Sequence, residues 1–431
     1  MTAQGDQQQR DQQQANGSST TQDERNLERY ADRLAMPIRQ KTAEMQRSGR
    51  LRHVIFSGQF SPDLLESLGD TADQIRILSK TREGKDFLRG LLAHRRVMLY
   101  FTQPSTRTFL SFTAACQILG ITCNEVRDPQ TSSETKGETR FDSIRMFSSY
   151  FNLIIMRSPI ARLAESCAYL MNDLEKTGQR SVPIVNAGSG ADEHPTQALL
   201  DVYTLQRTFK FENPADSPVS RLDELRGRYG YADLSPGLAG KTYGFCGDIG
   251  RGRTVRSLAM LLAEYPGVRL VFVTSDHPKL RMRDDLRQRL TDRGVPIHEV
   301  DSFEAPVPTP AGDKPAIEAI DALYMTRVQK EHDAPGEESS YDSLDINQYR
   351  LDRSLVDRMK AYAPILHPFP RDQHFGEIPP ELDSDPRAMY FRQARNGMWV
   401  RAALLAHLLD VDHAISRQYL HESRERHDYS S

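Results

Sequence analysis

The sequence predicts an α/β protein of two doubly wound domains, in which helices cover parallel sheets. From about Val97, short apolar runs alternate with longer segments of helical spacing, and this order is typical of parallel sheets. The runs are too many for one sheet, and 431 residues are enough for two or three domains.

The expected strands are the short apolar runs over residues 97–101, 153–156, 183–185, 242–246, 269–274, 322–325 and 364–366. Between most of them, apolar residues recur at three- and four-residue steps, as on one face of a helix. This spacing predicts helices over 108–119, 195–207 and 254–264.

Four stretches fall outside this alternation. Residues 1–25 are rich in Gln, Ser and Thr and predict a disordered polar tail, because they cannot bury enough surface to offset the entropy of ordering. Apolar residues from Asn26 to Met45 predict one amphipathic helix ahead of the main body. Segments near 211–236 and 305–316 lack periodicity and are rich in turn residues, so we interpret them as inserted loops.

The composition argues against several classes of protein. Lys and Arg total 56 against 59 Asp and Glu, a net charge of −3, which gives no reason to expect a nucleic-acid partner. No run approaches the roughly 18–20 apolar residues of a membrane span, and the N-terminus lacks the apolar core of a secretory signal. The four cysteines form no CxxC pair or Cys/His cluster, so we expect reduced thiols, a cytoplasmic protein and no metal site.

A hydroxyl-rich motif follows the first expected strand. Ser105, Thr106, Arg107 and Thr108 stand where a helix begins, and the free N–H groups and dipole of a helix N-terminus favour an anion. Arg107 could hold phosphate oxygens with its planar fork of donors. On local chemistry alone, an ordinary Ser/Thr cap beside a surface arginine explains the motif equally well.

Three further groups lie in the first half of the chain. The loop with Ser132 and Lys136 is weak evidence alone, and a solvated loop is the better interpretation. Arg157 ends an expected strand, where α/β proteins bind ligands, although a snorkelling surface arginine is the alternative. His194 and Gln197 stand at a helix start, where a neutral imidazole could donate to a carbonyl oxygen that gains charge. A lone loop histidine more often has only a structural role.

Arginines also follow strands in the second half. Arg253 lies after a glycine-rich turn that is not the GxGxxG motif of dinucleotide-binding proteins. Arg327 and Gln329 are two residues apart, so in extended chain they face the same side and suit a carboxylate.

The loop after the last expected strand contains Pro368 and Phe369. Its prolines lack N–H groups and leave carbonyls free to accept from an amine or amide. Polar or cationic groups thus follow five or more strands of one series, which a solvated surface does not readily produce.

Taken in order, these motifs resemble the aspartate/ornithine carbamoyltransferase family, and its aspartate branch in particular. The resemblance runs from about residue 95 to 409 and is carried by Ser105-Thr106-Arg107-Thr108, Ser132 to Glu138, Met156-Arg157, His194-Pro195-Thr196-Gln197, Gly252-Arg253-Thr254, Thr326 to Glu331 and His367-Pro368-Phe369-Pro370-Arg371. The sequence departs from the family pattern at Gln103, Phe109, Ser158 and Phe369, without losing a residue of direct chemical role.

The resemblance implies transfer of the carbamoyl group of carbamoyl phosphate to the amine of L-aspartate, with N-carbamoyl-L-aspartate and phosphate as products, in pyrimidine synthesis. It implies a carbamoyl-phosphate domain over 26–196, completed by a returning C-terminal helix within 394–425, and an aspartate domain over 197–393. The insertion near 211–236 would then pack on the outside of the aspartate domain. No cofactor is implied. A homotrimer with shared active sites is implied, and a regulatory or pathway-enzyme partner is left open.

The resemblance also implies a role for each motif. Phosphate would be held by Ser105, Thr106, Arg107 and Thr108. The carbamoyl oxygen would be held by Thr108, Arg157 and His194, and the carbamoyl amide by Gln197 and the carbonyl of Pro368. Ser132 and Lys136 would reach in from a neighbouring subunit, Lys136 toward both substrates. Aspartate would be bound by Arg253, Arg327 and Gln329, with Phe369 beside the amine. Direct catalytic roles would fall to Arg107, Thr108, Lys136, Arg157 and His194.

Two other functions compete with this one. The first is carbamoyl transfer to another amino acid. Ornithine-type members of the family have a pattern similar to His-Cys-Leu-Pro in the late loop, whereas this chain has His-Pro-Phe-Pro from His367. Arg327 with Gln329 also suits a dicarboxylate better than a diamine. The second is a homologue that binds carbamoyl phosphate without catalysis, against which the intact set of polar residues argues.

Overall fold

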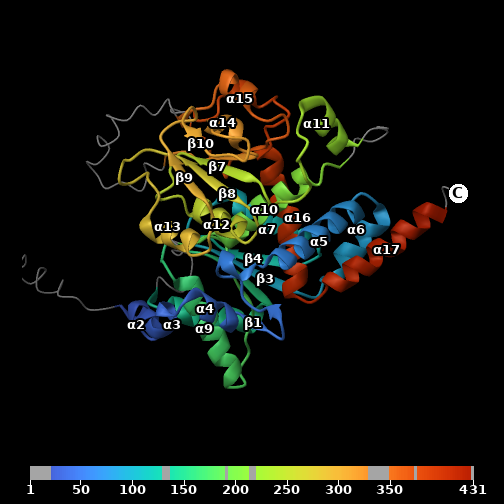
Figure 1. The fold of residues 1–431 in the computed structure, drawn as a ribbon. Helices are drawn as coiled ribbons and strands as arrows, with labels where there is room; N and C mark the ends of the chain where they lie inside the picture. Colours follow the sequence, from blue (N-terminus) through green and yellow to red (C-terminus); the bar gives the residue numbers. More distant parts are fainter. Residues whose placement is uncertain are drawn as a thin grey trace, which may run out of the picture.

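The structure, a computed structural model, describes residues 21–128, 136–189, 193–212, 220–328, 349–372 and 376–428. Within these ranges the chain forms two parallel sheets with helices packed on them (Figure 1). The predicted fold class is therefore confirmed.

The first sheet has four parallel strands. In spatial order they are β4 (Thr122–Val126), β3 (Arg96–Phe101), β5 (Leu153–Arg157) and β6 (Ile184–Asn186). The helices of this part are α5 (Pro62–Leu78), α6 (Arg82–Leu91), α7 (Thr106–Ile118), α8 (Arg140–Tyr150) and α9 (Leu163–Lys176). The connection after β3 leads to β4 on one side, whereas the connection after β5 leads to β6 on the other side. The direction of the connections therefore reverses between β3 and β5, and α/β sheets bind ligands at such a point.

The second sheet has five parallel strands. In spatial order they are β13 (Ile365–Leu366), β12 (Ala322–Met325), β7 (Thr242–Cys246), β8 (Arg269–Val273) and β9 (Ile297–Val300). Its helices include α12 (Arg253–Leu262), α13 (Asp284–Thr291), α14 (Ala316–Ala319) and α15 (Arg353–Arg358). The reversal of connections lies between β7 and β12, the strands that precede Arg253 and Arg327.

All seven strands expected from apolar runs are present, and two further strands of the parallel sheets are not predicted. The missed strands β4 and β9 lie at the edges of their sheets, and none of their side chains is fully buried. Because these edge strands carry polar residues such as Asn124 and Glu125, they lack the apolar run that marks a strand covered on both faces.

The leading segment differs from the prediction. It forms three short helices, α2 (Gln22–Glu28), α3 (Ala31–Ala35) and α4 (Ile38–Glu44), so the single helix over 26–45 is wrong. Pro37 explains the second break, because the residue before a proline is pushed out of the helical region, and Met36 has ψ 151°. The predicted tail is also too long at its end, since Thr21 caps α2 in a capping box. Residues 1–20 lie outside the described residues.

Arg33 joins this leading segment to α9, which lies beside α2–α4 in Figure 1. Its guanidinium lies over the Tyr169 ring, 4.1 Å from the centroid, and its Nη1 donates to Asp173 Oδ1 at 2.9 Å. The same guanidinium also pairs with Glu44 on α4. Because Tyr30 and Leu34 are buried as well, the segment is part of the packed body.

The two predicted insertions have secondary structure of their own. The first contains α11 (Arg221–Tyr229), and its residues 213–219 lie outside the described part of the chain. Tyr231 joins it to the second sheet's side of the molecule, where its Oη accepts from Ala361 N at 3.1 Å. This agrees with the expected packing. The second is an antiparallel hairpin of β10 (Pro306–Val307) and β11 (Lys314–Pro315) rather than a loop.

Helix α16 (Tyr390–Leu408) brings the chain back to the first part of the fold. It packs against α5, α7 and the helix that precedes the insertion, α10 (Pro195–Phe209). The following helix α17 (Asp412–Asp428) packs along α5 and projects from the body together with α6 (Figure 1). The C-terminal helix therefore returns as expected, while the domain bounds at 196 and 393 stay a prediction.

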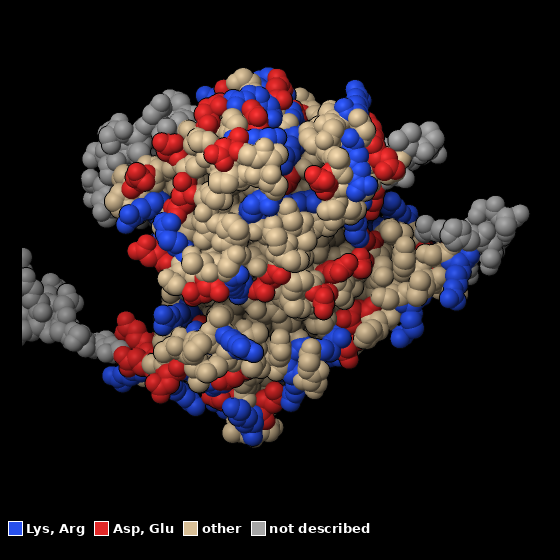
Figure 2. All heavy atoms as spheres, viewed as in Figure 1, with Lys and Arg blue, Asp and Glu red and all other residues tan. Residues whose placement is uncertain are grey.

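The surface and the helices fit the balanced composition. Figure 2 shows Lys and Arg side chains mixed with Asp and Glu over the visible face. Every helix in the described ranges is too short or too polar to cross a bilayer.

We predict that Arg33→Ala lowers the free energy of unfolding by about 1–3 kcal/mol, since it removes a cation–π contact and two partly buried ion pairs. Urea unfolding measures this loss. The matched control is Arg39→Ala, which changes an exposed arginine on α4 and should leave stability within about 0.5 kcal/mol. Equal stability of Arg33→Ala and wild type would mean that the leading segment is not held in this way.

Candidate active site

The loops that follow several strands of both sheets meet at one cavity of about 350 Å³. The predicted site residues that line it are Ser105, Arg107, Thr108, Arg157, His194, Gln197, Arg253, Pro368 and Phe369. They come from α7, the ends of β5 and β13, and the first turns of α10 and α12. Residues of both sheets are thus brought together at the reversal points of their connections.

The other predicted residues lie elsewhere. Thr106 is the first residue of α7 and is not among the lining residues. Lys136 is exposed and does not line the cavity of its own chain. Arg327 lies close enough to lower the pKa of Arg107. Ser132 and Gln329 lie outside the described residues.

The N-terminus of α7 is prepared for an anion. Ser105 is its N-cap residue, yet its side chain makes no capping hydrogen bond, so the first N–H groups of the helix have no partner from that hydroxyl. Burial, and after it the charge of Arg327, lowers the pKa of Arg107. The guanidinium of Arg107 lies 5.6 Å from the ring centre of Phe369, so the two halves of the site touch across the cavity.

Arg157 and His194 are buried polar residues, and each has a side-chain nitrogen without a hydrogen-bond partner among the described residues. Arg157 Nη1 donates to the carbonyl of Ala187 at 3.1 Å, but its Nε lacks a hydrogen-bond partner among the described residues, and so does His194 Nδ1. Burial, with Arg253 and Arg401 nearby, lowers the pKa of Arg157 to about 9, so it stays cationic at neutral pH. Buried polar atoms without partners are costly, and the place of these two beside a cavity indicates a ligand.

The protonation state of His194 follows from the same surroundings. Burial, followed by the charges of Arg157, Arg253 and Arg401, holds the pKa of His194 well below its ordinary value. The imidazole is therefore neutral, and it can donate one hydrogen bond without adding a proton to the site.

Gly188 makes room for this pair. It has φ +96°, and a Cβ at this position would lie 2.7 Å from both Arg157 Nη1 and His194 Cδ2. Asn186 Oδ1 fixes the turn by accepting from the N–H groups of Gly188 and Ser189, at 2.9 and 3.0 Å. Any side chain here would displace Arg157 and His194 from their present positions.

Asp201 is a fully buried carboxylate one turn along α10 from Gln197. It accepts from Gln197 Nε2 at 2.9 Å and from Gln393 Nε2 at 2.6 Å, and its second oxygen accepts from Tyr324 Oη at 2.9 Å. Gln393 lies on α16 and Tyr324 on β12, so one carboxylate joins three distant segments. Burial raises its pKa to about 7, although the three hydrogen bonds act in the opposite direction.

The loop from His367 to Phe369 is held from both sides. Its His367 N–H donates to Gln393 Oε1 at 2.8 Å, and the imidazole Nδ1 accepts from Phe369 N at 2.8 Å. His367 Nε2 lies 2.8 Å from the fully buried Glu377. Phe369 has φ +55°, which a non-glycine residue rarely adopts, so these contacts maintain an unfavourable conformation that presents its ring to the cavity.

Arg401 is a further cavity residue that the sequence motifs do not reveal. It is 2% exposed on α16, where its Nη1 donates to Ser111 Oγ at 2.7 Å and its Nη2 to the Thr196 carbonyl at 3.4 Å. Burial lowers its pKa to about 10. A charged residue within the apolar helical run after Trp399 is the signal that could have found it, as Asp201 is within α10.

The cavity is cationic. Five arginines line it, and none of its described lining residues is Asp or Glu. No cluster of three His, Cys, Asp or Glu side chains suited to a metal ion occurs in the described ranges. Such a site can hold anionic groups and donate to an oxygen that gains negative charge.

Family models match both halves of the chain. Residues 52–207 match the carbamoyl-phosphate-binding domain of aspartate/ornithine carbamoyltransferases, and residues 239–408 match the Asp/Orn-binding domain. The chain therefore belongs to the aspartate/ornithine carbamoyltransferase family. The insertion near 211–236 lies entirely between the two matched regions, and α17 lies beyond the second.

Two similar proteins carry names from the aspartate branch of this family. A protein of Arabidopsis thaliana named chloroplastic aspartate carbamoyltransferase is 35% identical over 362 residues, which cover 83% of this chain and 78% of the relative. The aspartate carbamoyltransferase catalytic subunit of Chromobacterium violaceum is 34% identical over 360 residues, which cover 83% of this chain and 98% of the relative.

Solved structures agree with the sequence comparison. The catalytic subunit of M. jannaschii aspartate transcarbamoylase has a TM-score of 0.64 and 31% identity, covering 84% of this chain and 98% of that chain. Aspartate transcarbamoylase of Trypanosoma cruzi, in complex with N-(phosphonacetyl)-L-aspartic acid, has a TM-score of 0.64 and 29% identity, covering 83% of this chain and 95% of that chain.

We predict that Asp201 makes stability depend on pH. Its pKa is about 7 in the folded protein against an ordinary value of 3.8, so between these values only the folded state holds the proton. The free energy of unfolding should therefore fall as pH rises through this window, by up to about 1.4 kcal/mol per unit from this group. Urea unfolding at several pH values measures the slope. Asp201→Asn should remove that contribution, and equal slopes in the two proteins would contradict it.

Proposed function

We propose that this chain is an aspartate carbamoyltransferase, which transfers the carbamoyl group of carbamoyl phosphate to the amine of L-aspartate. The products are N-carbamoyl-L-aspartate and phosphate, as used in pyrimidine synthesis. One observation carries the proposal: buried Arg157 Nε and His194 Nδ1, which lack hydrogen-bond partners among the described residues, lie at a cationic cavity beside the N-terminus of α7. Relatives that carry this name over most of the chain support it.

The proposed chemistry follows from the donors. The aspartate amine attacks the carbamoyl carbon, the carbonyl oxygen gains negative charge, and the bond to phosphate breaks. Thr108, Arg157 and His194 stabilise the oxygen, because hydrogen-bond donors fixed in a dry site need no reorganisation as charge develops. Ser105, Thr106, Arg107 and Thr108 hold the leaving phosphate at the start of α7.

The remaining residues orient the substrates. Gln197, fixed by Asp201, and the carbonyl of Pro368 hold the carbamoyl amide. Arg253 binds the α-carboxylate of aspartate, and Arg327 with Gln329 binds its side-chain carboxylate. This placement turns a reaction between two molecules into one between fixed neighbours.

We also propose that the protein is a homotrimer in which Ser132 and Lys136 complete the site of a neighbouring subunit. Two features support this: Lys136 is exposed away from its own cavity, while Leu110, which lines that cavity, is 56% exposed. An apolar side chain at the rim of a cationic site is suited to cover by a second copy. A cytoplasmic location, and a regulatory or pathway-enzyme partner, stay predictions.

The test is to incubate the purified protein with carbamoyl phosphate and aspartate, ornithine or other amino acids, and to identify carbamoylated products. Carbamoyl-aspartate alone supports the proposal. Another product would assign the chain to a different amine. Carbamoyl-phosphate binding without any product would instead identify a non-catalytic homologue.

We predict that Arg157→Ala lowers turnover by at least about 10²–10³-fold, the usual effect of removing one donor to a developing oxyanion. Steady-state kinetics with both substrates measures the loss. Arg82→Ala, on an exposed arginine of α6, is the control and should retain full turnover. Near-normal turnover of the Arg157 variant would contradict its role.

We predict that Gly188→Ala lowers kcat by about 10²-fold, because displacement of Arg157 and His194 by its Cβ misaligns the reacting groups. Gly178→Ala is the matched control: it also has a positive φ of 73°, but its Cβ would meet no atom within 4 Å. Comparable losses of kcat in both variants would show that backbone strain, rather than crowding, causes the effect.

A further inference from the structure

Donors dominate the cavity of about 350 Å³ at which the two sheets meet, and we call it the substrate cavity. Five arginines line it, and a guanidinium can donate hydrogen bonds but cannot accept them. Two of the lining residues, Gln197 and Pro368, offer a carbonyl oxygen, which can only accept. Such an oxygen favours a ligand that carries an N–H group and is left unpaired by a methyl group.

The side-chain amide of Gln197 presents its oxygen only when it is turned the right way. One end of the amide accepts and the other donates, and the two ends are nearly equal in size, so a half-turn exchanges them. The partner that holds one end of this amide therefore decides whether the cavity receives an acceptor or a donor.

Asp201 decides this for Gln197. Oδ1 of the buried carboxylate accepts from Gln197 Nε2 at 2.9 Å. Nε2 is thereby committed to Asp201, and Gln197 Oε1, at the other end of the amide, has no hydrogen-bond partner among the described residues. The oxygen is thus the end that is left for the substrate cavity, which Gln197 lines.

Gln393 prevents the carboxyl group from reversing this arrangement. Gln393 Oε1 accepts from the His367 N–H at 2.8 Å, so its Nε2 faces Asp201 and donates to the same Oδ1 at 2.6 Å. A proton on Oδ1 would therefore meet N–H groups, whereas a proton on Oδ2 would lie beside Tyr324 Oη, which can accept it. Oδ1 stays an acceptor whether or not the carboxyl group is ionised.

The same carboxylate acts on the second acceptor. Gln393 holds the His367 N–H and so fixes the chain directly before Pro368. The carbonyl of Pro368 is the other oxygen that is proposed to hold the carbamoyl amide. One oxygen of Asp201 is therefore linked to Gln197 directly and to the Pro368 loop through Gln393.

We propose that Asp201 is a specificity-determining residue that acts through Gln197. By holding the NH2 end of that amide, and through Gln393 the loop of Pro368, it presents two acceptors to the ligand and selects a carbamoyl group over an acetyl group. A methyl in place of the NH2 leaves both acceptors unpaired. This role rests on the proposed function, which assigns the carbamoyl amide to these two oxygens. Asp201 is not among the lining residues and is a positioning residue.

Two stable ligands separate this selection from turnover. In phosphonoacetamide a methylene replaces the bridging oxygen of carbamoyl phosphate, and in 2-oxopropylphosphonate a methyl also replaces the NH2 group. Calorimetric titration of the full-length protein should show at least about tenfold tighter binding of phosphonoacetamide. Equal affinities would overturn the proposal. Binding of neither ligand would overturn the proposed function together with it.

Removal of the carboxylate tests its role. Asp201→Ala leaves a space that a water molecule can fill, and water donates as readily as it accepts, so the Gln197 amide is free to turn. The preference for phosphonoacetamide should fall to within about threefold. Asp201→Asn should restore it, because Gln393 keeps the Asn oxygen toward the two amides. Asp201→Ser, whose hydroxyl also donates and accepts, gives the same test if the alanine variant does not fold.

Two results would overturn this proposal and leave the proposed function intact. The first is an undiminished preference in the alanine or serine variant, and the second is loss of the preference in Asp201→Asn.

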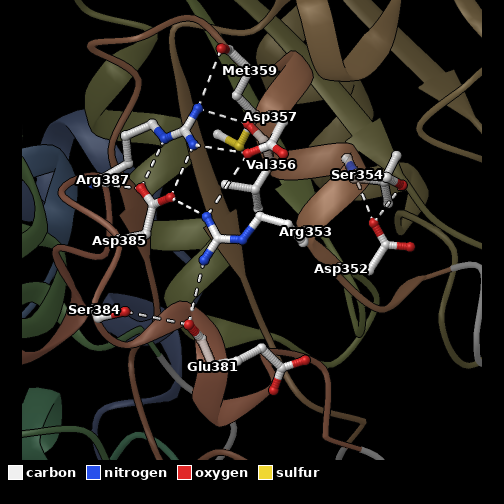
Figure 3. A network of polar contacts seen from close by, with 11 residues as sticks. Asp352, Arg353, Ser354, Val356, Asp357, Met359, Glu381, Ser384, Asp385 and Arg387 are labelled. Carbon is white, nitrogen blue, oxygen red and sulfur yellow. Dashed lines mark hydrogen bonds and ion pairs between the residues drawn. The ribbon is translucent and has the colours of Figure 1, made fainter.

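Asp385 provides the matched control, because it is a second buried carboxylate that holds several donors (Figure 3). It accepts from Arg387 Nε at 2.9 Å and from Arg353 Nη1 at 2.7 Å. None of these three is among the described residues that line the substrate cavity. Asp385→Ala should therefore lower stability but keep the preference of wild type. An equal loss of preference in Asp385→Ala and Asp201→Ala would indicate a general loss of packing and overturn the proposal.

Discussion

The buried carboxylate of Asp201 is the constraint on which the site depends. It accepts hydrogen bonds from α10, α16 and β12, and so fixes the second sheet and the returning helix against the helix that carries His194 and Gln197. Gln393 also accepts a hydrogen bond from the His367 N–H, so it fixes the His367 loop as well. A lone ionised carboxylate in such a place would be strongly unfavourable, so the three donors are what make it tolerable. The same donors set the distance between the two halves of the site.

The concentration of positive charge is the second organising feature. Arginines 107, 157, 253, 395 and 401 line a cavity without carboxylates in its described lining, and the burial of several lowers their pKa values. Carbonyl groups of neighbouring elements partly offset the unfavourable burial of these charges, as the Ala187 carbonyl does by accepting a hydrogen bond from Arg157. An anionic ligand would relieve the mutual repulsion of these groups, so ligand binding and local stability are coupled.

Local sequence was informative where one segment alone determines structure. The central strands are apolar throughout, and the motifs after them locate nine of the cavity residues. It failed where a partner lies far along the chain. Gln393 is 192 residues from Asp201, and Ser111 is 290 from Arg401, so no local pattern reveals either contact. The edge strands β4 and β9 were missed because they lack a continuous apolar run. The break at Pro37 was missed for the opposite reason, since the apolar spacing continues across a proline that ends the helix.

Helix α10 extends from the substrate cavity to a second cavity beside the insertion. His194 is its N-cap residue and Gln197 lies in its first turn, while Arg207 and Thr208 in its last turn line that second cavity of about 1180 Å³. The fifteen residues of α10 form one continuous helix that spans about 22 Å. The helix therefore connects the two cavities through one rigid element. Changes in length or composition of the insertion at its far end can tilt the substrate-facing end without altering any residue that contacts substrate. The inserted segment can thus diverge in sequence and adjust the chemistry from a distance.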